Sequence, residues 1–189
     1  MPEGDPSPEQ LKVQVEVWPL TTPQLSEEFL ATIAPHMRSL KERSLRLRTD
    51  RTEEQTQLSL QYLENRLRAL KEGDAVLTAR NGSNIIGFVL LRWDEQEKRT
   101  KVEQFYVEAN LRSKGVGTKI LVRALEYALR SHSNISQGVF LSTDKNTPEK
   151  TNRARKLYED TGFHVSSVPG DVSWEDRFDL DFGTEQKSV

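Results

Sequence analysis

Two glycines at the junction of a predicted strand and a predicted helix constrain this chain more than any other feature. Residues 102–107 are apolar, aromatic and β-prone, which is typical of a buried strand. Residues 118–130 carry apolar side chains at helical spacing. Gly115 and Gly117 lie between them, where the helix start presents unpaired N–H groups and the positive end of its dipole. Because glycine has no Cβ, a phosphate or pyrophosphate group has room to approach this backbone.

The glycine spacing by itself does not identify a ligand. A P-loop is excluded, because no Lys-Ser or Lys-Thr follows a suitably spaced glycine pair. The G-x-G-x-x-G pattern is also incomplete, because Gly117 is followed by Thr118, Lys119 and Ile120. Taken alone, the loop is compatible with an anion site and equally with a tight turn.

The remaining periodicities predict a mixed α/β protein. We expect strands at 12–18, 75–79, 85–93, 100–107, 138–142 and 173–182, with 164–168 as a further short candidate. We expect five helices. The first starts at Thr22-Pro23 and the second at Pro35, and the third contains the leucines at 60–70 and is closed by Gly73. The fourth covers 118–130, and the fifth runs from Thr147-Pro148 to Thr161, with Gly162 after its end. Asn81-Gly82 predicts a hairpin between two of the strands. This order of elements favours one sheet covered by helices.

Length and composition indicate a single domain. Of the 189 residues, we assign 10–183 to this domain, and 1–9 and 184–189 to disordered tails. The longest apolar run, Ile85–Leu91, is too short to span a bilayer, and a net charge of −2 gives no pull toward nucleic acid or membrane. The absence of cysteine excludes disulfides and a thiol nucleophile. We expect a cytoplasmic protein, as a monomer or homodimer, that binds neither nucleic acid nor membrane.

Two motifs resemble those of the GNAT acetyltransferase superfamily. The stretch Phe105-Tyr106-Val107, followed after four residues by Arg112-x-x-Gly115-x-Gly117, is similar to the acetyl-CoA loop of that family. A second stretch, Ala154-x-x-Leu157-Tyr158-x-x-x-Gly162-Phe163, is similar to its closing motif. The resemblance covers about residues 74–163. It implies a mostly antiparallel sheet whose central parallel pair of strands splays apart to hold acetyl-CoA.

The resemblance also implies which residues contact the acyl donor. They are Phe105, Tyr106, Val107, Arg112, Ser113, Lys114, Gly115, Val116, Gly117, Thr118 and Asn152. The last assignment departs from the family, which often has Asn seven residues before the tyrosine. Here that position is Thr151, with Asn152 beside it and Asn146 as a third option.

Two side chains are candidates for proton chemistry. Glu103 lies where some family members carry a catalytic-site glutamate, and it is our candidate general base, although a salt-bridged glutamate fits the sequence equally well. Tyr158 is the candidate group that meets the departing thiolate, with a core tyrosine as the alternative. We expect no metal site, because His36, His132 and His164 lack the spacing of metal ligands.

The acceptor is less constrained. We expect an N-acetyltransferase that uses a ternary complex and a primary amine on a small molecule. The alternatives are a protein lysine or N-terminal acetyltransferase, and an acyl-CoA-binding protein without turnover. The basic stretch 38–51 favours an acidic acceptor or the cofactor phosphates, whereas the acidic stretch 171–181 favours a cationic acceptor, so the two signals conflict.

Overall fold

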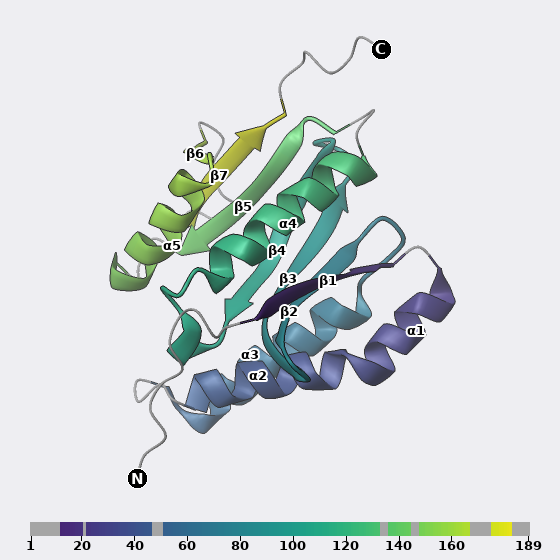
Figure 1. Ribbon diagram of the computed structural model, residues 1–189, viewed down its shortest axis with the longest axis vertical. Coiled ribbons are helices and arrows are strands. Elements are labelled where there is room, and N and C mark those ends of the chain that lie inside the picture. Colours follow the sequence, from purple (N-terminus) through teal and green to yellow (C-terminus); the bar gives the residue numbers. More distant parts are fainter. Residues whose placement is uncertain are drawn as a thin grey trace.

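The computed structural model describes residues 12–20, 22–46, 51–132, 136–144, 148–166 and 175–182. Their strands form one seven-stranded sheet in the order β1-β2-β3-β4-β5-β7-β6 (Figure 1). The strands are β1 (Val13–Pro19), β2 (Ala75–Asn81), β3 (Asn84–Asp94), β4 (Arg99–Val107), β5 (Gly138–Asp144), β6 (His164–Val165) and β7 (Glu175–Asp181). All neighbouring strands are antiparallel except β4 and β5, which are parallel. The predicted mixed, mostly antiparallel sheet is confirmed.

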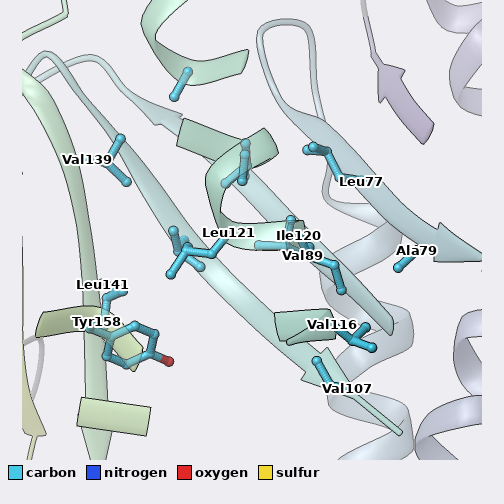
Figure 2. Close-up of a cluster of buried hydrophobic side chains, with 14 of the residues drawn as sticks. Leu77, Ala79, Val89, Val107, Val116, Ile120, Leu121, Val139, Leu141 and Tyr158 are labelled. Carbon is cyan, nitrogen blue, oxygen red and sulfur yellow. The ribbon is translucent and has the colours of Figure 1, made fainter. Parts of the chain in front are cut away.

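Helices cover the two faces of the sheet unequally. One face carries α1 (Pro23–Thr32), α2 (Ala34–Arg46) and α3 (Glu53–Arg68), and the other carries α4 (Val116–Ser131) and α5 (Pro148–Asp160) (Figure 1). Each face has its own core. The α4 core includes Leu77, Val89, Val107, Val116, Ile120, Leu121, Val139, Leu141 and Tyr158 (Figure 2). The α2 core includes Phe29, Ile33, Met37, Leu40, Leu63, Leu67, Val76, Phe88 and Leu90.

Residues next to helix α3 explain where it starts, and Gly73 lies beyond its end. The Thr52 hydroxyl accepts a hydrogen bond from the Gln55 amide, and the Gln55 side chain accepts one from the Thr52 amide, which forms a capping box. The prediction that this helix continues to Gly73 is wrong, since it ends at Arg68. Gly73 instead takes a left-handed conformation, with φ of 90°, in the turn before β2.

Three other boundaries refine the predictions. Asn81 still pairs with Asn84, so the hairpin turns on Gly82 and Ser83, one residue later than expected. Helix α4 begins at Val116, two residues before the predicted Thr118, because left-handed Gly115 is its N-cap. The helix predicted to restart at Pro35 is confirmed in α2, whereas residues 173 and 174 of the predicted last strand lie outside the described residues.

The parallel strands β4 and β5, at the centre of the sheet, pair over only a few residues. Pairing runs from Arg99 opposite Gly138 to Val102 opposite Leu141, and no described residue beyond these continues it. At the same point β4 is irregular: Leu91 lies opposite Val102 and Leu90 opposite Gln104, which leaves Glu103 as the extra residue of a β-bulge. Beyond Val102, β4 therefore presents to the β5 side an edge that the described strands do not pair.

Candidate active site

The loop after β4 places its backbone for anion binding. A short 3₁₀ turn, η2 (Ala109–Leu111), leads from β4 into it, and Arg112 Nε donates to the Val107 carbonyl at 3.0 Å. Ser113 and Gly115 are both left-handed, with φ of 65° and 78°. No side chain in the described part of the chain caps the N-terminus of α4. The first N–H groups of α4, with the positive end of its dipole, are thus available to an anion.

The two glycines of this loop have different roles. A Cβ added at Gly115 would meet no atom within 4 Å, so the space beside it is open. A Cβ at Gly117 would lie 3.4 Å from Phe105 Cζ and 3.4 Å from Leu157 Cδ2. The expectation that both glycines leave room for an anion therefore fits Gly115, whereas the missing side chain at Gly117 allows α4 to pack closely against β4 and α5.

The end of β4 faces both layers of the protein. Phe105 and Val107 pack in the α4 core, while Tyr106 packs against the α2 core and stacks on Phe88 with ring centroids 5.6 Å apart. The Arg112 guanidinium lies 5.7 Å from the Tyr106 ring centroid. The predicted donor-binding residues of β4 and the loop, from Phe105 to Thr118, are therefore contiguous in space as well as in sequence. The side chain of Asn152 lies outside the described residues, as do those of Asn146 and Thr151.

Tyr158 lies on α5, facing the open edge of β4. The residue is 7% exposed, and its ring packs against Phe163 and Phe178. Figure 2 shows the hydroxyl pointing from α5 toward the side on which Val107 lies. No described residue hydrogen-bonds this hydroxyl, and burial raises the pKa of Tyr158 to about 12. Tyr158 is thus a neutral phenol at physiological pH, with its proton available to a ligand.

Glu103, at the bulge of β4, is held by two cations. Its side chain is 4% exposed, with Oε1 3.0 Å from Arg66 Nε and Oε2 3.4 Å from Lys101 Nζ. Since Arg66 belongs to α3, the carboxylate points to the α1–α3 face of the sheet, opposite to Tyr158. To accept a proton from a substrate, Glu103 has to compete with these two cations for its own carboxylate oxygens.

Lys41 of α2 lies beside the bulge, and the motifs did not single it out. Its residue is 8% exposed, and its Nζ lies 3.5 Å from Gln104 Oε1. Burial, followed by repulsion from Arg51, lowers the pKa of Lys41 to about 8. Its spacing could have predicted its burial, because Lys41 lies four residues after buried Met37 and four before buried Leu45, on the apolar stripe of the helix.

The other described charges of the basic and acidic stretches are largely neutralised within the protein. Arg38, Arg43 and Arg46 form ion pairs with glutamates. Asp179 pairs with Arg177 at 2.9 Å, and Asp181 pairs with Arg99. Among the described residues, no group of three or more metal-ligating side chains occurs, and no helix is long and apolar enough to cross a membrane.

Comparison with known proteins agrees with this geometry. Residues 37–163 match the model of the acetyltransferase (GNAT) family. No curated protein matches the sequence at a significant level.

Three solved structures illustrate the shared fold. An N-acetyltransferase from Thermoplasma acidophilum, PaiA, in complex with coenzyme A aligns with a TM-score of 0.64 at 15% identity, covering 89% of this chain and 99% of that one. The ribosomal-protein-S18-alanine N-acetyltransferase of Escherichia coli aligns with a TM-score of 0.57 at 12% identity, covering 91% of this chain and 97% of that one. An aminoglycoside 6'-acetyltransferase type Ii aligns with a TM-score of 0.58 at 16% identity, covering 78% of this chain and 90% of that one. At these identities the likeness is one of fold and does not specify an acceptor.

Proposed function

The chain belongs to the GNAT family of acetyl-CoA-dependent acetyltransferases, and from that premise we propose that it acetylates the primary amine of a small molecule. The observation that carries the acetyl-CoA part of this proposal is the edge of β4 that no described strand pairs, which lies between the loop at Arg112–Thr118 and the Tyr158 hydroxyl. In this proposal the loop binds the pyrophosphate of acetyl-CoA through backbone N–H groups. The β4 edge binds the pantetheine arm as an added strand would.

Transfer is direct in this proposal. The amine nitrogen attacks the thioester carbonyl carbon, the carbon–sulfur bond breaks, and coenzyme A leaves as a thiolate. Because the chain contains no cysteine, no acyl-cysteine intermediate forms, so donor and acceptor are bound together. A backbone N–H of the β4 edge is the proposed donor to the oxyanion that develops during attack.

Tyr158 assists the leaving thiolate by hydrogen bonding. With its pKa near 12 and a thiol near ~8.5, complete proton transfer to sulfur is uphill by about 5 kcal/mol. A neutral donor at the sulfur still stabilises the developing negative charge without giving up its proton. We therefore assign Tyr158 the role of hydrogen-bond donor rather than of a general acid that completes transfer.

Glu103 is our proposed base for the ammonium of the acceptor, acting through water. An amine with a pKa of ~10 is only about one part in a thousand neutral at pH 7, so some group or solvent has to remove its proton. The ion pairs with Arg66 and Lys101 fix the position of the carboxylate on the α1–α3 face of β4, which we propose is the side from which the acceptor amine approaches. They also compete for its oxygens, so the alternative is that Glu103 only orders these two cations.

The experiment that tests the proposal measures thiol release from acetyl-CoA with a panel of small amines, lysine peptides and peptides with free N-termini. We expect turnover with small amines and a matching loss of acetyl-CoA. Turnover only with peptides would favour a protein acetyltransferase. Binding of acetyl-CoA by calorimetry, with no turnover of any amine, would favour a non-catalytic acyl-CoA-binding protein.

A further inference from the structure

Lys41 is a buried ammonium group whose described polar neighbour is uncharged. Its Nζ contacts the amide oxygen of Gln104 at the long distance of 3.5 Å. In the described ranges, no carboxylate forms an ion pair with Lys41. A buried ammonium is normally compensated by a carboxylate, because its desolvation is costly. Among the residues that the structure describes, none supplies such a carboxylate to this charge beside the bulge of β4.

A second cation makes the uncompensated charge larger. Arg51 repels Lys41, and its described hydrogen bond goes from Nη1 to the neutral hydroxyl of Ser59, at 2.7 Å. No described carboxylate is ion-paired with Arg51 either. At pH 7 a lysine with a pKa near 8 is about nine-tenths protonated, so both groups are cationic. Two neighbouring cations, one of them buried, form a site that an anion would bind favourably.

The position of this site relates it to the acceptor rather than to the donor. Gln104 lies on β4 between Glu103 and Phe105, and Lys41 approaches it from α2, on the α1–α3 face. The loop at Arg112–Thr118 instead opens α4, which covers the opposite face (Figure 1). Lys41 thus approaches β4 from the face to which Glu103 points, whereas the helix that the loop opens covers the other face.

A buried polar group on β5 supports the same location. Ser142 follows Leu141, the last β5 residue that pairs with β4, so it lies where the two strands stop pairing, next to the bulge at Glu103. The Ser142 hydroxyl is buried and has no hydrogen-bond partner among the described residues. It lies on the same strand face as Phe140, whose ring centroid is 5.9 Å from Lys101 Nζ. Cations and an unsatisfied hydroxyl therefore flank the bulge on the acceptor side of the sheet.

We propose that the acceptor amine also carries a carboxylate, as in an amino acid, and that Lys41, supported by Arg51, binds this carboxylate. The inference rests on the proposed function and gives it a substrate class. It also resolves the conflict between the basic and acidic stretches. The described carboxylates of Asp179 and Asp181 are bound by Arg177 and Arg99, whereas Lys41 is not neutralised by any described residue.

The test compares amino acids with the amines formed by their decarboxylation: lysine with cadaverine, tyrosine with tyramine, and arginine with agmatine. We expect kcat/KM to be at least tenfold higher for the amino acid of at least one pair. In Lys41→Met the preference should fall to near unity through KM, and Lys41→Arg should restore part of it. Arg43→Met is the matched control, since Arg43 is an exposed, ion-paired cation of the same helix. It should leave the preference unchanged.

Binding provides a readout that does not depend on turnover. Calorimetry of each amino acid with the protein–coenzyme A complex should show at least tenfold weaker binding to Lys41→Met, with coenzyme A affinity unchanged. If coenzyme A affinity itself falls tenfold, Lys41 serves the donor and the inference is overturned. Turnover that is equal or faster with the decarboxylated amines also overturns it, while the proposed function stands. Acetyl-CoA binding without turnover or binding of any amine overturns both.

Discussion

The uncompensated charge of Lys41 should cost the protein stability, and its removal tests this directly. Lowering a lysine pKa from 10.5 to about 8 corresponds to about 3 kcal/mol of lost stabilisation for the charged form. Lys41→Met keeps the length of the side chain and removes the charge. It also removes the long hydrogen bond to Gln104, which is worth up to about 1 kcal/mol. The variant should therefore be more stable than the wild type at pH 7 by about 2 kcal/mol.

The stability difference between the wild type and Lys41→Met should depend on pH. Below pH 8 Lys41 is charged in both the folded and the unfolded chain, and the full cost applies. Between pH 8 and 10.5 the folded protein loses the proton first, so the wild type gains stability relative to the variant. Ionisation of Tyr158, whose raised pKa lowers stability between pH 10 and 12, affects both proteins equally and cancels.

The assay is urea unfolding at pH 7 and pH 10, monitored by tryptophan fluorescence, with Arg43→Met as the control. Thermal unfolding followed in the same way should show the difference of about 2 kcal/mol as a melting temperature higher by about 4–8 °C at pH 7. The advantage of Lys41→Met should shrink at pH 10. A variant less stable than the wild type at pH 7, or an advantage independent of pH, would refute the reasoning that the charge is uncompensated.

Three further predictions concern the donor side and the base. Tyr158→Phe should lower kcat about ten- to a hundredfold and leave acetyl-CoA affinity near that of the wild type, as measured by steady-state kinetics and calorimetry; an unchanged kcat with rate-limiting chemistry would return Tyr158 to a packing role. Gly115→Ala should cost about 1 kcal/mol of stability, because φ is 78°, and should weaken acetyl-CoA by placing a methyl group in open space. Gly82→Ala, with φ of 60° and equally open surroundings, is its control and should cost similar stability without changing affinity. Glu103→Gln should be slow near pH 7 and recover as pH rises, so kcat/KM profiles parallel to those of the wild type would exclude Glu103 as the base.

Local patterns in the sequence predicted most of the fold. Strands and helices were placed within a few residues because alternation, helical spacing and proline positions act locally. The main error, at Gly73, has a physical reason. A glycine after an amphipathic run marks a left-handed residue, but the same conformation also serves a turn, and here the turn before β2 uses it.

The candidate site was predicted in part. The loop and Tyr158 belong to contiguous motifs, so their residues appear together in the sequence. The environment of Glu103 depends instead on a bulge in β4 and on Arg66 of a helix that precedes it by about forty residues. The burial of Lys41 required knowing which face of α2 packs onto the sheet, whereas the sequence shows only a basic stretch at 38–51.

The short parallel ladder between β4 and β5 has a consequence for amide exchange. Residues 99–102 provide the β4 side of the pairing that joins strands β1–β4 to β5, β7 and β6, so few ladder hydrogen bonds tie the two parts of the sheet together. The part containing β5 and β7 is then expected to open at a lower free energy than β3, which is buried between both cores. If acetyl-CoA binds along the β4 edge as proposed, it bridges the two parts, and slower deuterium uptake in residues 138–144 and 175–181 should report its binding.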